Sequence, residues 1–116
     1  MINAVLYREG DFLTGCRLKG HSGQDEYGKD IVCAGVSILT CSCVNTLEHV
    51  YGVVPRMNEE NPEKGLLDFD LPDEMTEEEN GQAQIVMSVL RQGLEDLSAE
   101  YPQFVTLSIK ERRKQP

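Results

Sequence analysis

A histidine and a cysteine twelve residues apart, His21 and Cys33, are the residues of this chain best suited to covalent chemistry. The segment between them contains Gly23 and Gly28, and Asp30 has the side chain of a helix N-cap. With Asp30 as the cap, Cys33 is the third helical residue, where the positive end of the helix dipole favours a thiolate over a thiol. His21 could then serve as a base, so this pattern suits a cysteine nucleophile.

A purely structural interpretation competes with this one. Cys33 can pack as a small hydrophobic residue and His21 can lie in a surface loop, and a single Cys/His pair does not carry a function from one family to another. Asp30 also opposes activation, because its charge raises the pKa of a neighbouring thiol unless the carboxylate is occupied as a cap. Spacing alone therefore favours the structural interpretation.

The remaining polar clusters offer little other chemistry. Cys41 and Cys43 are two residues apart in an expected helix and so point to different sides, and no second pair of ligands completes a metal site. The acidic run at residues 68–79 does not match a calcium loop, and we interpret it as a solvated edge followed by a helix cap. The alternative is that this run attracts a basic substrate. We expect no metal and no cofactor.

Composition defines the class of protein. The chain has 116 residues and a net charge of −9, which we interpret as one acidic domain, 1–116. This charge argues against direct nucleic-acid binding and favours a basic partner. We see neither a signal peptide nor a membrane-spanning segment and expect a cytoplasmic protein without membrane contact, whose four cysteines are reduced.

The elements that must position His21 and Cys33 follow from periodicity. Residues 1–19 predict a β-hairpin around Gly10, because apolar and polar residues alternate on both sides of it. Residues 30–51 have helical periodicity and end before Gly52. The expected buried stripe of this helix is Val32, Val36, Leu39, Cys43, Leu47 and Val50, whereas Cys33, Ser37 and Thr40 are expected on an adjacent face.

The second half of the chain repeats the alternation of strands and helix. Residues 53–71 predict a second hairpin, and the capping-box pattern from Thr76 to Glu79 starts a helix that runs to about Glu100. Its expected buried residues are Val86, Val89, Leu90, Leu94, Leu97 and Tyr101. Residues 104–109 form the last strand. The prediction is an α+β fold of order β-β-α-β-β-α-β, with a mainly antiparallel sheet and two helices packed on one face.

Two linked motifs resemble those of a known family. They read Gly20-His21-Ser22 and then Gly28-x-Asp30-Ile31-Val32-Cys33-Ala34-x-Val36-Ser37. At this separation they resemble the bacterial ribosomal-processing cysteine protease family, Prp. The resemblance extends along nearly the whole chain and is weaker over residues 53–80. Ser22 stands where family members often have alanine.

The resemblance implies an activity and a set of roles. The family cuts a short N-terminal extension from large-subunit ribosomal protein twenty-seven during bacterial ribosome assembly. Cys33 would be the nucleophile, and His21 the general base and then the acid. The resemblance also implies a homodimer and a mobile loop that meets the substrate. That loop would include Ser22, Gly23, Tyr27 and Gly28, with supporting positions at Gly20, Asp30 and Ser37.

Two other classes of protein stay open beside the protease. One is a non-catalytic module that binds a ribosomal protein during ribosome assembly and in which Cys33 is structural. The other is a thiol redox protein, against which the absence of a C-x-x-C motif argues. The protease leads because of the family motif, and not because of composition or spacing.

Overall fold

The computed structural model describes residues 1–20, 29–58 and 65–112, and these ranges contain five strands and two helices. In chain order the elements are β1 (Ile2–Glu9), β2 (Phe12–Lys19), α1 (Lys29–His49), β3 (Arg56–Met57), β4 (Gly65–Asp70), α2 (Glu77–Glu100) and β5 (Val105–Glu111). The predicted order of strands and helices is confirmed.

The strands form one sheet in the order β3-β4-β2-β1-β5. The β1–β2, β2–β4 and β3–β4 pairs are antiparallel, whereas β5 lies parallel to β1. The α+β fold is confirmed, and the mainly antiparallel sheet is more precisely a mixed one. Because β4 already occupies the far side of β2, the chain returning from α2 adds at the open side of β1.

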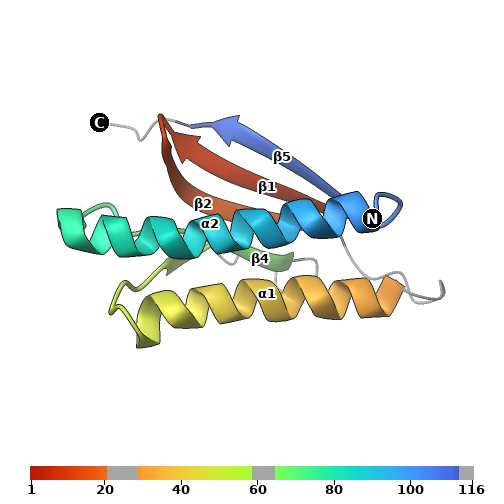
Figure 1. Cartoon of the computed structure of the whole chain (residues 1–116), viewed down its shortest axis with the longest axis horizontal. Coiled ribbons are helices and arrows are strands. Elements are labelled where there is room, and N and C mark those ends of the chain that lie inside the picture. The colour runs from red at the N-terminus through yellow and green to blue at the C-terminus, as the bar shows by residue number, and fades with distance from the viewer. Residues whose placement is uncertain (21–28, 59–64, 113–116) are drawn as a thin grey trace.

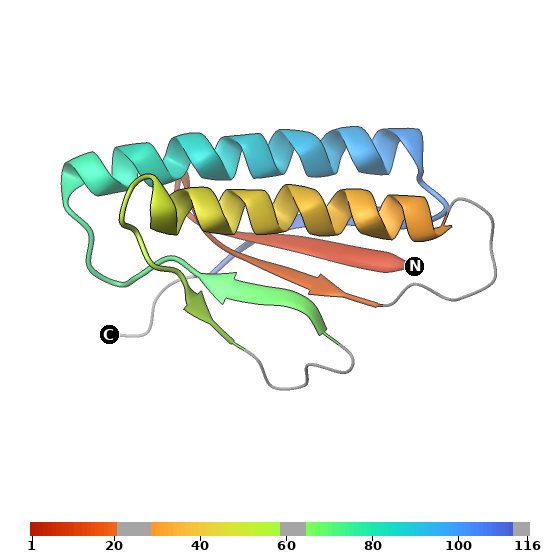
Figure 2. The same cartoon turned by 90° about the horizontal axis from the view of Figure 1, so that it is seen from below.

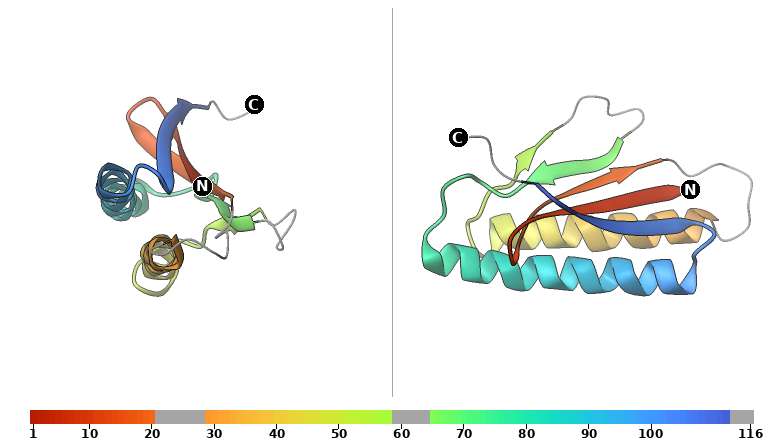
Figure 3. Two further views of the ribbon diagram at one scale, coloured as in Figure 1. Left: turned by 90° about the vertical axis from the view of Figure 1, so that its right-hand side faces the viewer. Right: turned by 90° about the horizontal axis from the view of Figure 1, so that it is seen from above.

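Both helices cover the same face of the sheet, as the end-on view of Figure 3 shows. They run antiparallel beside each other (Figure 1). A side chain added at Gly93 would come within 2.5 Å of Leu39, and one added at Gly35 would come within 3.9 Å of Leu97. The glycine at position 93, which costs helix propensity, therefore allows the two helices to approach closely.

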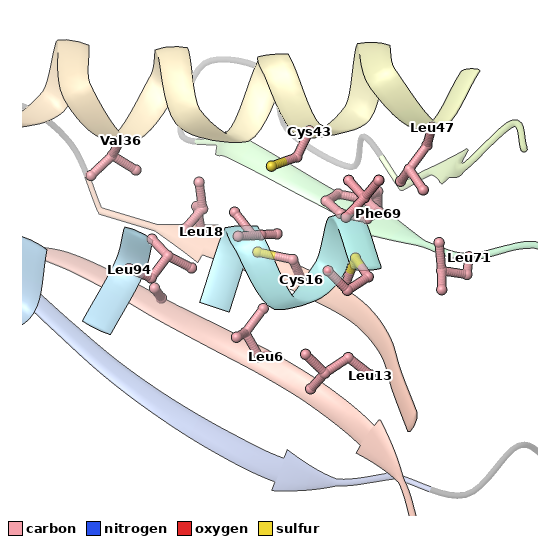
Figure 4. Close-up of a cluster of buried hydrophobic side chains, with 14 of the residues drawn as sticks. Leu6, Leu13, Cys16, Leu18, Val36, Cys43, Leu47, Phe69, Leu71 and Leu94 are labelled. Atoms are coloured by element: carbon pink, nitrogen blue, oxygen red, sulfur yellow. The ribbon is translucent and has the colours of Figure 1, made fainter. Parts of the chain in front are cut away.

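The core lies between the sheet and the helices (Figure 4). Phe69 of β4 is completely buried at its centre, next to side chains from the first hairpin and from both helices. Ile2, Ala4 and Leu6 of β1 are buried as the alternation predicts, and so is Leu18 of β2. The apolar face of the sheet therefore rests on the two helices.

One part of the first hairpin departs from simple alternation. Gly10 has φ +61° in the turn, as predicted. The register of the β1–β2 pair then shifts between Tyr7 and Arg8. As a result Leu13 is buried and Phe12 is 53% exposed, so the predicted alternation that begins at Phe12 is wrong near the turn. A bulge moves every later side chain to the other face, and periodicity does not reveal its position.

Helix α1 differs from the prediction at its start and in its buried face. It begins at Lys29, so Asp30 lies inside the helix rather than at its N-cap. Thr40 was expected beside Cys33 on the adjacent face, but it is buried, and its hydroxyl donates to the carbonyl oxygen of Val36 at 2.6 Å. That bond satisfies the hydroxyl in an apolar core. Val50 is 67% exposed because the helix ends at His49.

Helix α2 begins as predicted. The backbone N–H of Glu79 donates to the Thr76 hydroxyl at 3.1 Å, and the backbone N–H of Thr76 donates to the Glu79 carboxylate at 2.9 Å. This capping box confirms the predicted start. Val89 is 54% exposed instead of buried, and Ala83 and Met87 complete the buried stripe in its place. The sheet and α1 select which apolar residues of the helix are buried.

The acidic run is more strongly paired than the sequence indicated. Asp68 lies 3.5 Å from Arg17, and Asp70 lies 3.4 Å from Arg56 and also pairs with Arg112. These arginines come from neighbouring strands and from the C-terminal segment. The interpretation of Asp68 and Asp70 as a merely solvated edge is therefore wrong.

Helix α1 is unusually apolar for a surface helix. The segment Ile31–His49 is long enough and has a high enough mean hydropathy, 1.6, to cross a membrane by length and composition alone. The expectation from the sequence concerned an uninterrupted apolar run, which Ser37, Thr40 and Ser42 interrupt, and the expected absence of a membrane span stays a prediction. In the structure this helix packs on α2 and the sheet through Val32, Val36, Cys43 and Leu47. Apolar side chains also occur on the opposite side of α1, where Ile31 and Ile38 are exposed.

Candidate active site

Cys33 lies at the beginning of α1 and is half-buried. It is the fifth residue of the helix and packs at the edge of the core. Its neighbours Val32 and Val36 are buried, whereas Ala34 and Ser37 are exposed. The thiol therefore sits at a boundary, held by packing on one side and accessible on the other. This is the position that a nucleophile for an external substrate requires.

The start of α1 supplies electrostatic support to this position, but less than the sequence predicted. The backbone N–H groups of the first turn have no acceptor within the helix, and they lie just before Cys33. The helix dipole weakens within one turn, and Cys33 is the fifth helical residue, two residues further in than the third position predicted for it. The prediction that Asp30 is the N-cap was wrong, because α1 begins at Lys29. The side chain of Asp30 lies outside the part of the chain that the structure describes.

Gly20 has a structural reason to be glycine. Its φ is +99°, and a Cβ added there would collide with the carbonyl oxygen of Met1. Both the conformation and the space therefore exclude other residues. The chain leaves the sheet through this residue, directly before His21.

The end of β2 and the start of α1 lie at the same end of the molecule (Figure 2). Gly20 and Cys33 thus belong to one end of the fold, although a stretch of undescribed chain separates them in sequence. The other predicted loop and site residues lie outside the described residues: His21, Ser22, Gly23, Tyr27 and Gly28. Their roles, including that of His21, stay predictions.

Ser37 follows Cys33 by one helical turn and lies on the same side of α1. It is exposed, as its predicted place on the adjacent face implies. Ser37 can therefore meet a substrate that reaches Cys33. Its supporting role also stays a prediction.

The four cysteines are free and have different environments. Burial raises the pKa of Cys16 to about 12, with Asp68 and Cys43 adding to the shift, and burial also raises the pKa of Cys43. Both thiols are buried, so they stay protonated and shielded. Cys33 and Cys41 are the two that reach the surface. Among residues 1–20, 29–58 and 65–112, no three side chains suited to a metal ion come together.

The structure also shows a pocket that sequence reasoning missed. It lies where the first hairpin, the residues after β4 and the first turns of α2 meet. Its residues come from three segments that are far apart in the sequence, and no motif links them. The one available signal was Phe12, a large apolar residue beside a predicted turn.

Comparison with known proteins identifies the family. The sequence profile of the family described as "Cysteine protease Prp" matches residues 1–106. The Ribosomal processing cysteine protease Prp of Bacillus subtilis (strain 168) is 28% identical over 102 residues, which make up 87% of this chain and 90% of that protein.

Solved structures agree with this match. The SMU.848 protein of Streptococcus mutans superposes with a TM-score of 0.84 at 32% identity, over 97% of this chain and 96% of that one. The essential ribosomal processing protease Prp of S. aureus, solved with a substrate peptide, has a TM-score of 0.76 at 25% identity, over 95% of this chain and all of that one. The chain therefore belongs to the Prp family and is a cysteine protease.

Proposed function

We propose that this protein removes the N-terminal extension of large-subunit ribosomal protein twenty-seven during bacterial ribosome assembly, with Cys33 as nucleophile and His21 as general base and acid. The observation that carries the proposal is the family match over residues 1–106, which includes both residues. The B. subtilis relative is named for ribosomal processing, and the S. aureus relative was solved with a substrate peptide. The net charge of −9 suits a basic substrate, and we place the reaction in the cytoplasm.

The proposed reaction uses the two residues in sequence. His21 takes the proton of the Cys33 thiol, and the thiolate attacks the scissile carbonyl carbon. The tetrahedral intermediate collapses when His21 returns that proton to the leaving amine, which is the new N-terminus of the ribosomal protein. Water then attacks the thioester, and the extension leaves as a carboxylic acid while the thiol is regenerated.

The described residues support the first step in two ways. Cys33 is half-buried and packs against the hydrophobic core, which limits the motion of the attacking atom. The backbone N–H groups at the start of α1 lie one turn away and can donate to the developing oxyanion. We assign Gly20, Asp30 and Ser37 supporting roles, and we assign Ser22, Gly23, Tyr27 and Gly28 to the substrate loop.

The substrate is tested by intact mass. The extended ribosomal protein is incubated with the enzyme, and the expected product is smaller by the mass of the extension. The same ribosomal protein made without its extension serves as the control and should keep its mass. An extended protein that stays intact while short peptides of other sequences are cut would contradict this choice of substrate.

We also propose that the protein is a homodimer that joins through the outer face of α1. Ile31 and Ile38 on this face are 66% and 68% exposed, and Ala34 and Cys41 beside them are exposed as well. No charged residue occurs between Ile31 and Leu47. A two-fold contact places this face against a copy of itself, and an uncharged face of small and branched side chains is self-complementary.

The dimer proposal predicts a large effect of one charge. Ile38→Glu should raise the dimer dissociation constant at least about a hundredfold, because it places two like charges near the axis of the contact. Light scattering after size exclusion gives the mass. Val54→Glu is the control, since Val54 is a 58% exposed residue outside α1. A wild-type monomer, or an Ile38→Glu dimer as tight as wild type, would contradict the proposal.

A further inference from the structure

A pocket of about 330 Å³ lies at the start of α2. Phe12 and Leu13 come from the first hairpin, Leu71 and Met75 lie between β4 and α2, and Glu77 and Gln84 come from the first turns of α2. We call this pocket, with all of the residues that line it, the distal pocket. Its volume is at the small end of the range for ligand sites and so suits one or two side chains of a partner.

The walls of the distal pocket are fixed by hydrogen bonds. The side-chain amide of Gln84 donates to the carbonyl oxygen of Leu13 at 2.8 Å and accepts from its backbone N–H at 2.9 Å. The backbone N–H of Leu71 donates to the carbonyl oxygen of Thr14 at 2.8 Å. These hydrogen bonds hold the hairpin, the end of β4 and the start of α2 together. Ordering the pocket walls on ligand binding should therefore cost little conformational entropy.

The chemistry of the pocket selects a cation with an apolar stem. Its lining combines apolar side chains, among them Phe12, Leu13 and Leu71, with polar ones and with three acids, Glu9, Asp73 and Glu77. The carboxylate of Asp73 lies 3.6 Å from the guanidinium group of Arg56, whereas Glu9 and Glu77 have no ion-pair partner among the described residues. None of the described residues that line the pocket is basic. Arginine and lysine side chains fit this lining, because their methylene stems can pack on the apolar side chains while their charged groups pair with the carboxylates.

The distal pocket lies far from Cys33. Gly35, two residues after Cys33, lies beside Leu97, thirteen residues along α2 from Gln84 and twenty from Glu77. At the helical rise per residue this corresponds to roughly 20–30 Å. Figure 2 shows α2 beginning at the end of the molecule opposite to the start of α1. An extended chain covers this span with about six to ten residues.

We propose that the distal pocket is a second binding site for the substrate protein, which inserts an arginine or lysine side chain from a basic segment outside the sequence at the cleaved bond. This inference rests on the proposed function and extends it. The enzyme then recognises two features, the cleavage sequence near Cys33 and a basic segment at the far end. A short peptide reaches the first alone, whereas the whole ribosomal protein reaches both.

The test compares two substrates and two matched variants. Glu77→Lys reverses a charge on the rim of the pocket, and Glu78→Lys makes the same change one residue later, outside the lining but in the same first turn of α2. For Glu77→Lys we expect kcat/KM to fall about fivefold or more with the full ribosomal protein at physiological salt and to stay unchanged with a short peptide across the cleavage site. Glu78→Lys should match wild type on both.

The outcomes separate the two proposals. An equal fall with both substrates, no fall with the full protein, or an equal fall for Glu78→Lys would overturn the second site. A wild-type enzyme that cleaves neither substrate would overturn the proposed function instead. In that case a fluorescent hexa-arginine peptide still tests the pocket, because its anisotropy should show weaker binding to Glu77→Lys than to Glu78→Lys. Equal binding to both variants would overturn the pocket.

Discussion

Cys33→Ser should lower kcat/KM for the extended ribosomal protein by at least about a thousandfold while leaving the fold intact. A serine hydroxyl stays protonated in the place of a thiol and is a far weaker nucleophile. Cys33 is half-buried at the edge of the core, and serine is only slightly smaller than cysteine. The free energy of unfolding should therefore change only modestly. Steady-state kinetics and thermal unfolding give the two readouts.

The matched control for this variant lies on the same helix. Cys41 is exposed on α1, so Cys41→Ser should keep wild-type kinetics. His21→Ala should be as inactive as Cys33→Ser and equally well folded, because it removes the proposed base. Cleavage by Cys33→Ser at the wild-type rate would show that another residue is the nucleophile.

Gly20→Ala is expected to have the second largest effect. The residue has φ +99°, and an added Cβ would collide with the backbone at Met1, so either β1 or the segment before His21 must move. We expect the free energy of unfolding to fall by about 2 kcal/mol or more. Activity should also fall, since Gly20 directly precedes the proposed base.

A second glycine provides the control for Gly20. Gly81 lies in the exposed part of α2, and an added Cβ would meet nothing within 4 Å. Gly81→Ala should therefore raise the free energy of unfolding by up to about 1 kcal/mol, because alanine is the better helix former. Urea denaturation measures both variants. A Gly20→Ala protein as stable as wild type would show that the collision is relieved without cost.

The features that the sequence predicted well are those that short segments determine. The Gly10 turn and the Thr76 capping box depend on a few neighbouring residues, and both occur where they were predicted. The strand and helix order followed from periodicity together with these turn and cap residues. Gly52, with φ +70°, also ends α1 as predicted.

The features that the sequence missed depend on contacts between distant segments. The bulge that buries Leu13, the pairing of β5 with β1, and the burial of Thr40 are set by neighbours in space. The distal pocket requires three segments at once. In the site itself, Cys33 was identified through the family motif, whereas its predicted helix cap, Asp30, lies inside α1.

The family assignment also changes the weight of the competing interpretations. A non-catalytic binding module was plausible when Cys33 and His21 were judged by spacing alone. The match over residues 1–106 makes the chain a cysteine protease, and Cys33 sits where an external substrate can reach it. A redox role finds no support, since Cys16 and Cys43 are buried thiols with raised pKa values.

The most direct test of Cys33 as the nucleophile follows activity and alkylation together. The protein is treated with limiting iodoacetamide at mildly acidic pH, and peptide mass spectrometry measures the modified fraction of each cysteine. Cys16 and Cys43 should stay unmodified because both thiols are buried, and Cys41 lies on the proposed dimer face. We predict that Cys33 reacts before Cys41 and that residual cleavage activity equals the unmodified fraction of Cys33. Full activity in protein whose Cys33 is completely alkylated would contradict the account.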